Sequence, residues 1–148
     1  MNVITITDDE VIKVLNIEES HFLDLKSKEI QPAKLTKTIA SLANAEGGEL
    51  FVGIREDKTK DQSIWDGFDR LEDANGHIQI FDQLFPLGDG FGYSFLQNIN
   101  SKGYVLKIDV EKSGSIKMAS DKKIYVRRGA QNLLLIDETH IDRLKRNK

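Results

Sequence analysis

The chain has 148 residues, of which 39% are hydrophobic and 30% are charged, and it contains no cysteine. This length and composition suit one soluble globular domain over residues 1–148. The lack of cysteine excludes disulfide frameworks, thiolate metal sites and cysteine nucleophiles. No apolar run reaches the roughly 18 residues of a membrane helix, and the N-terminus lacks a signal-peptide pattern, so we expect a cytoplasmic protein without a membrane partner.

Apolar periodicity and end signals predict four elements in the first half of the chain: helix 7–15, strand 20–27, helix 33–45 and strand 49–56. Thr7 and Glu10 form a capping box at the start of the first helix. Pro32 is suited to the first turn of the second helix. Gly53 within the second strand indicates a bend or a close backbone approach.

The second half reads as a polar loop followed by further elements: loop 57–68, helix 74–85, strands 91–99, 104–110 and 123–128, and basic helix 138–145. A turn after Ile99 joins two of these strands as an antiparallel hairpin, and Asp137 caps the last helix. The order of elements predicts an α+β domain in which helices flank a small mixed β-sheet.

The net charge of −3 conceals an uneven distribution of charged residues. Residues 1–101 hold 9 Lys and Arg against 18 Asp and Glu, whereas residues 102–148 hold 12 against 6. A protein that is acidic overall binds polyanions only where its cations gather on one face. The basic C-terminal third therefore indicates either such a face or a mixed, solvated surface without a partner.

Two carboxylates at the strand 20–27 are candidates for metal binding. Glu19 and Asp24 are five residues apart, so a regular strand places them on opposite faces unless Glu19 belongs to the preceding turn. Converging carboxylates would bind a divalent cation, whereas the structural alternative is an ion pair between Asp24 and Lys26 on one face. The three histidines lack metal-ligand spacing: His21, His77 and His140.

The strand 123–128 is a candidate for nucleic-acid contact. Tyr125 and Arg127 share one of its faces, whereas Arg128 points to the other. An aromatic ring beside an arginine is suited to stacking on a base and binding a phosphate. Arginines on an exposed strand also keep its edge soluble, so the pattern alone leaves both interpretations open.

Three motifs follow one another along the chain: Glu19-Ser20-x-x-Leu23-Asp24-Leu25-Lys26, Ala40-x-x-Ala43-Asn44-x-x-Gly47-Gly48-x-Leu50-x-x-Gly53-Ile54 and Ile124-Tyr125-Val126-Arg127-x-Gly129. Together they resemble the Schlafen-type AlbA domain family over about residues 19–136. The resemblance implies an α+β fold with a small mixed sheet and nucleic acid as the partner. Members are described as DNA-binding domains, transcriptional regulators or ATP-binding proteins. The structural part of the motif would comprise Asn44, Gly47, Gly48 and Gly53.

The resemblance also implies an enzymatic alternative, because the domain of animal Schlafens is similar to a metal-dependent RNA endonuclease with three carboxylates. Glu19 and Asp24 match the first two acids, and the third falls at Glu56 or Asp57. Mg²⁺ or Mn²⁺ would then be the cofactor, whereas no cofactor is expected otherwise. The chain departs from the pattern, since Asp24 stands where a glutamate is usual and Arg55 brings a cation close to the proposed site.

We expect a non-catalytic module that binds DNA or RNA, with the metal-dependent endoribonuclease as the alternative. The binding surface is predicted to contain six cations: Lys26, Lys28, Lys34, Lys37, Arg127 and Arg128. A third hypothesis is an interaction module, a homo-oligomer in which the hairpin 91–110 pairs edge to edge with a second copy.

Overall fold

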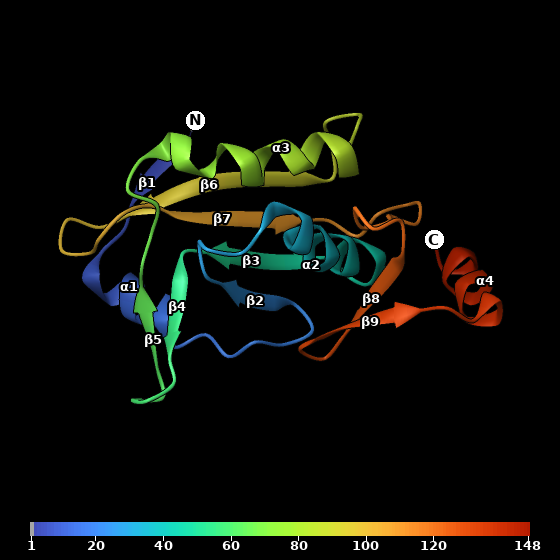
Figure 1. The fold of residues 1–148 in the computed structure, drawn as a ribbon, viewed down its shortest axis with the longest axis horizontal. Coiled ribbons are helices and arrows are strands. Elements are labelled where there is room, and N and C mark those ends of the chain that lie inside the picture. Colours follow the sequence, from blue (N-terminus) through green and yellow to red (C-terminus); the bar gives the residue numbers. More distant parts are fainter. Residues whose placement is uncertain (1) are drawn as a thin grey trace.

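The central element of the fold is a five-stranded mixed sheet, seen in a computed structural model that describes residues 2–148 (Figure 1). Its strands follow the spatial order β1 (Val3–Thr5), β6 (Phe91–Gln97), β7 (Val105–Val110), β3 (Gly48–Val52) and β2 (Leu23–Lys26). The outer pairs β1–β6 and β2–β3 are parallel, whereas β6, β7 and β3 are antiparallel to one another. The predicted α+β architecture is confirmed.

Helices cover both faces of this sheet. On one face, α2 (Pro32–Asn44) and α3 (Asn75–Leu84), which follows the 3₁₀ turn η1 (Leu71–Ala74), form the main core with β3 and β7. Leu35, Ile39 and Leu42 of α2 are fully buried there. On the other face, α1 (Asp8–Leu15) packs against a smaller cluster that includes Phe51 and Trp65. No helix within residues 2–148 has the length and apolar character needed to cross a bilayer.

The predicted helix boundaries agree closely with the structure because local signals set them. The hydroxyl oxygen of Thr7 accepts a hydrogen bond from the backbone N–H of Glu10 at 3.2 Å, and the Glu10 carboxylate accepts one from the Thr7 N–H at 3.3 Å. At the C-terminus, Asp137 accepts from the N–H of Thr139 at 2.8 Å and caps α4 (Glu138–Arg146). Satisfied N–H groups at the first turn define where a helix begins.

The predicted strand 49–56 and polar loop 57–68 are wrong in part. The strand breaks at Gly53, which has a φ of +122°, and β4 (Ile54–Asp57) leaves the central sheet to pair with β5 (Gln62–Trp65). A Cβ at Gly53 would lie 3.2 Å from both Gly67 and Val105, so only glycine permits this approach. The break carries Glu56 out of the alternation of β3.

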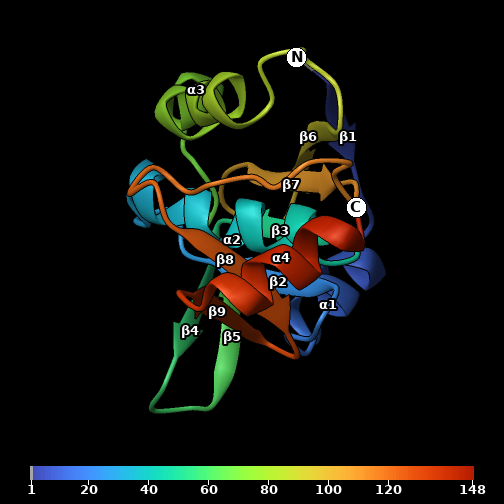
Figure 2. The same cartoon turned by 90° about the vertical axis from the view of Figure 1, so that its right-hand side faces the viewer.

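The β8–β9 hairpin forms a separate two-stranded sheet that packs on α2 (Figure 1). β8 (Ile124–Arg128) is the predicted strand, whereas β9 (Gln131–Leu135) was not predicted. The basic helix α4 lies at the same end of the molecule, as Figures 1 and 2 show.

The strand order restricts the predicted edge-to-edge pairing through the hairpin 91–110. Its strands β6 and β7 lie inside the sheet, so within residues 2–148 β7 is hydrogen-bonded to a neighbouring strand on each side. β6 is covered by β1 along Phe95–Gln97. Within residues 2–148, only Phe91–Ser94 of β6 keep an outer edge without a strand partner, so an oligomer formed through this hairpin stays a prediction limited to that segment.

Candidate functional site

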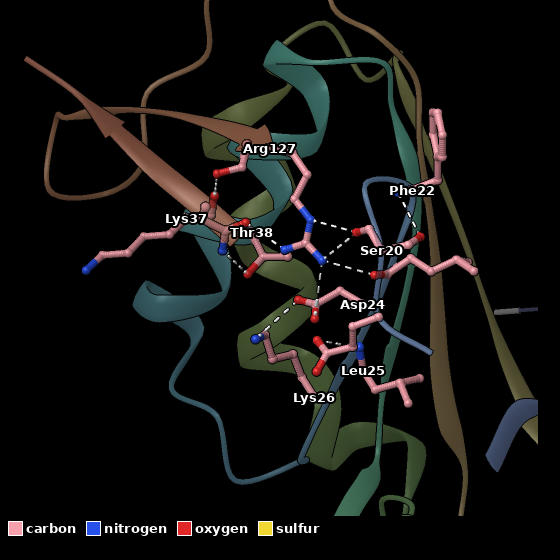
Figure 3. A network of polar contacts seen from close by, with 12 residues as sticks. Ser20, Phe22, Asp24, Leu25, Lys26, Lys37, Thr38 and Arg127 are labelled. Carbon is pink, nitrogen blue, oxygen red and sulfur yellow. Dashed lines mark hydrogen bonds and ion pairs between the residues drawn. The ribbon is translucent and has the colours of Figure 1, made fainter. Parts of the chain in front are cut away.

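Arg127 lies inside the protein, where it ties the β8–β9 hairpin to β2 (Figure 3). Its Nε and Nη2 donate hydrogen bonds to the carbonyl oxygen of Ser20 at 3.1 and 2.9 Å, and Nη2 donates to that of Leu23 at 3.0 Å. Its Nη1 donates to Asn132 Oδ1 at 2.8 Å, and Asn132 in turn donates to Thr38 on α2. With 1% of its surface exposed, Arg127 is not available to a phosphate, which corrects the expectation for this residue.

The carboxylate of Asp24 compensates this buried charge. Asp24 is fully buried, and its oxygens lie 3.7 Å from Arg127 Nη2 and 3.2 Å from Lys26 Nζ. Neither oxygen accepts a hydrogen bond, so ion pairing alone balances the carboxylate. Burying one of these charges without the other would be strongly unfavourable. The same-face ion pair between Asp24 and Lys26 is the structural alternative that the sequence left open.

The three candidate carboxylates do not converge. Glu19 and Glu56 line a cleft of about 770 Å³ between α1, β2 and the β4–β5 hairpin, and Leu25 lies on its wall. Asp24, the preceding residue on β2, points to the opposite face and toward Arg127. No group of three His, Asp or Glu side chains in residues 2–148 is placed to hold a metal ion. The residues therefore do not fit the Mg²⁺ or Mn²⁺ site implied by the resemblance.

Glu19 has a structural contact of its own. Its Oε2 accepts a long hydrogen bond, 3.5 Å, from the backbone N–H of Leu25 on the outer edge of β2. Asp57, the other candidate for the third acid, accepts hydrogen bonds from the Thr59 hydroxyl at 2.6 Å and backbone N–H at 3.1 Å within the β4–β5 turn. The Thr59 hydroxyl is the first of the contacts that lower the pKa of Asp57.

Lys26 and Lys28 are half-buried, and each pairs with a neighbouring acid. Lys26 pairs with Asp24, and its side chain is 29% exposed. Lys28 Nζ donates to the carbonyl oxygen of Gly67 at 3.1 Å and lies 3.4 Å from Asp66 Oδ1, with its side chain 18% exposed. These ion pairs place a neighbouring acid at each ammonium group and weigh against the expectation that Lys26 and Lys28 join a phosphate-binding surface.

The turn that precedes β8 is docked onto the first turns of α2. The N–H of Ser120 donates to Thr36 Oγ1 at 3.0 Å, and the Ser120 hydroxyl donates to the carbonyl oxygen of Ala33 at 3.2 Å. The turn is closed by a hydrogen bond of 2.9 Å from the N–H of Lys122 to the carbonyl oxygen of Ala119. Residues more than eighty positions apart in the sequence are thus fixed side by side.

This docking brings together four lysines, which we call the lysine patch: Lys34 and Lys37 of α2 with Lys122 and Lys123 of the turn. Lys34, Lys122 and Lys123 are exposed. The side chain of Lys37 is 42% exposed and lies 5.5 Å from the ring centre of Tyr125. Two of the six predicted cations therefore share a surface, with two lysines that sequence reasoning missed.

One acid lies within the lysine patch. Asp121 is 4.0 Å from Lys37 Nζ and accepts a hydrogen bond from the Tyr125 hydroxyl at 2.7 Å. This hydrogen bond is the largest cause that lowers the pKa of Asp121, and it raises the pKa of Tyr125. At neutral pH Asp121 is ionised and Tyr125 is protonated, so the patch keeps an excess of positive charge.

Arg128 is exposed but lies outside the lysine patch. It ends β8, whereas Lys123 immediately precedes the strand, and five residues of strand span about 16 Å. The signal for the missed lysines was present in the sequence as an adjacent pair just before a strand in the basic C-terminal third. Nothing local in that sequence shows which helix the turn contacts.

Asn44 fixes the segment that leads to the patch. Its side chain is buried, and Nδ2 donates to the carbonyl oxygens of Lys117 and Tyr125, each at 2.8 Å. Its Oδ1 accepts from the N–H of Lys117 at 2.7 Å.

Gly47, with a φ of +79°, follows α2 at a point where a Cβ would lie 2.5 Å from the carbonyl oxygen of Val110. At Gly48 a Cβ would lie 2.4 Å from the Phe22 carbonyl oxygen, so β3 meets β2 without a side chain between them.

Comparison with known proteins gives one family match. The family model described as Schlafen, AlbA_2 matches residues 19–135. Among solved structures, the crystal structure of the DIP2311 protein from Corynebacterium diphtheriae, a Northeast Structural Genomics Consortium target, is similar in fold, with 15% sequence identity and a TM-score of 0.60. The similarity covers 86% of this chain and 29% of that protein, so the chain spans less than a third of its length. No curated protein matches the sequence.

Proposed function

The chain belongs to the Schlafen AlbA_2 family, and on this premise we propose that it binds nucleic acid through the lysine patch. The observation that supports this function is the docking of the Ser120 turn onto α2, which gathers four lysines beside one acid. Nucleic acid is a polyanion whose affinity for proteins depends on such local cationic density rather than on net charge.

The chemistry of the patch favours contact with the phosphate backbone. Lysine ammonium groups are point charges on flexible stems, which suit phosphates but not the paired recognition of base edges by arginine or amides. The Tyr125 ring, already covered by Lys37 and bound to Asp121, is not free to stack on a base. We therefore infer binding with little sequence preference.

The test is a titration of fluorescently labelled single-stranded RNA and duplex DNA at about 50 mM salt. We expect the wild-type chain to bind at least one of these ligands. Replacing the four patch lysines by glutamine should weaken binding by about tenfold or more, because several phosphate contacts are lost together. The ligand with the higher affinity identifies the natural class, DNA or RNA.

A matched control carries the same change of charge elsewhere. Four exposed lysines lie outside the patch, on α1, the β4–β5 turn and the β6–β7 connection: Lys13, Lys58, Lys60 and Lys102. Their replacement by glutamine should reduce affinity much less than the patch variant does. Equal losses in the two variants would show that only net charge matters, and no binding by the wild-type chain would remove the proposal.

A further inference from the structure

The free edges of the sheets are protected to different degrees. On the outer edge of β2, Arg127 donates to the carbonyl oxygen of Leu23, and Glu19 accepts from the N–H of Leu25. The edge strand β1 has only three residues. The β4–β5 hairpin carries charged side chains at Arg55 and Glu56. Short strands, charged residues and occupied backbone groups are the usual means by which proteins prevent pairing between sheet edges.

The outer edge of β9 has none of these protections. Within residues 2–148, β9 pairs with β8 on one side and with no strand on the other. From Gln131 to Ile136 the chain carries no charge, proline or glycine. Leu133, Leu134 and Ile136 are 40%, 42% and 82% exposed, so large apolar side chains gather at this one edge. An exposed apolar edge strand of this kind is a template for another strand.

The hydrogen bonds of β8 show which backbone groups of β9 face outward. The carbonyl oxygens of Lys123 and Tyr125 accept from Ala119 and Asn44, so they point away from β9. The other residues of β8 are Ile124, Val126 and Arg128, and their backbone groups therefore bond to β9. Their partners in the register are Leu135, Leu133 and Gln131, respectively. The N–H and C=O groups of the residues between these partners, Asn132 and Leu134, point to the open side.

We propose that β9 pairs with β9 of a second copy, antiparallel and centred on Leu133. In this register Asn132 of one chain lies opposite Leu134 of the other, so outward N–H groups meet outward C=O groups by two-fold symmetry. Leu133 meets its own counterpart across the axis. The segment has no charge, so a second copy meets no like-charge repulsion there despite the net charge of −3. The two hairpins then form one four-stranded antiparallel sheet.

A cysteine at the symmetry axis tests this register directly, because the chain has no cysteine of its own. Residues opposite each other in a non-hydrogen-bonded antiparallel pair have Cα atoms about 4.5 Å apart, which a disulfide can span. We expect Leu133→Cys to form a disulfide-linked dimer under a mild oxidant. Ile99→Cys, at a position 91% exposed in the β6–β7 connection, is the control and should remain largely monomeric. Equal cross-linking of the two variants would contradict the proposal.

Charge exchange at the same position provides the second test, measured by sedimentation of the unmodified chain and its variants. The wild-type chain should dimerise at about 100 μM, and Leu133→Lys or Leu133→Glu should each weaken dimerisation by about tenfold or more, since like charges then meet at the axis. A mixture of the two variants should restore the dimer. A wild-type chain that is monomeric at about 500 μM overturns the proposal, as does a Leu133→Lys variant that dimerises normally or a mixture that does not.

Discussion

Replacing Arg127 with methionine is expected to lower the free energy of unfolding by about 3–5 kcal/mol. The substitution removes the buried one of the two cations that pair with Asp24, which is fully buried and 3.7 Å away, and leaves only Lys26 beside that carboxylate. It also removes both side-chain donors to the carbonyl oxygen of Ser20 and one of the two donors to that of Leu23, which keeps the N–H of Ser20. Urea unfolding followed by circular dichroism measures the change.

Two controls separate the ion pair from the size of the side chain. Arg128→Met alters the neighbouring exposed arginine and should change stability by no more than about 0.5 kcal/mol. The double variant Arg127→Met with Asp24→Leu should lose clearly less than the sum of the two single variants, because the buried carboxylate that Arg127 compensates is then absent as well. Strict additivity would show that Arg127 and Asp24 do not act together.

Replacing Asn44 with leucine is expected to destabilise the protein by about 3 kcal/mol or more. Three hydrogen bonds are lost, two to carbonyl oxygens and one from the N–H of Lys117, and these groups are left without partners at about 1–3 kcal/mol each. Unfolding in urea gives the magnitude. Faster amide hydrogen exchange at Lys117 would locate the effect in the segment that precedes the lysine patch.

The control for this second prediction is an amide on the surface. Asn100 is exposed, and its Nδ2 donates to Asp8 at 3.1 and 3.2 Å, so Asn100→Ala should cost less than about 1 kcal/mol. If Asn44→Leu were no more harmful than Asn100→Ala, the role of Asn44 in fixing the 117–125 segment would be refuted. Nucleic-acid affinity should fall with Asn44→Leu as well, because the turn that carries Lys122 and Lys123 would be less well held.

The sequence predicts those parts of the fold that depend on neighbouring residues. The capping box of Thr7 and Glu10 sets the start of α1, and the proline in the first turn of α2 and the cap at Asp137 place two further helices correctly. The strands β6 and β7 follow from their alternating side chains and the turn between them. β5 and β9 are missed because each is stabilised by pairing with a neighbouring strand rather than by an apolar–polar alternation of its own.

The candidate site is harder to predict because it depends on which surfaces meet. The sequence places Arg127 on one face of a strand but does not show that α2 and β2 cover that face. It also gives Lys28 no partner, whereas Asp66 lies beside it only after the chain bends at Gly53. Lys122 and Lys123 join Lys34 and Lys37 through the contacts of Ser120, which are tertiary rather than local.

The salt dependence of nucleic-acid binding tests most directly whether the lysine patch contacts phosphates. Each lysine that neutralises a phosphate contributes a slope of about −0.7 to −0.9 to the plot of log affinity against log salt. We predict that Lys122→Gln with Lys123→Gln reduces the magnitude of this slope by about 1.4–1.8, whereas Lys58→Gln with Lys60→Gln leaves it unchanged. A slope that the first pair does not alter, or that both pairs alter equally, would contradict a binding surface at α2 and the Ser120 turn.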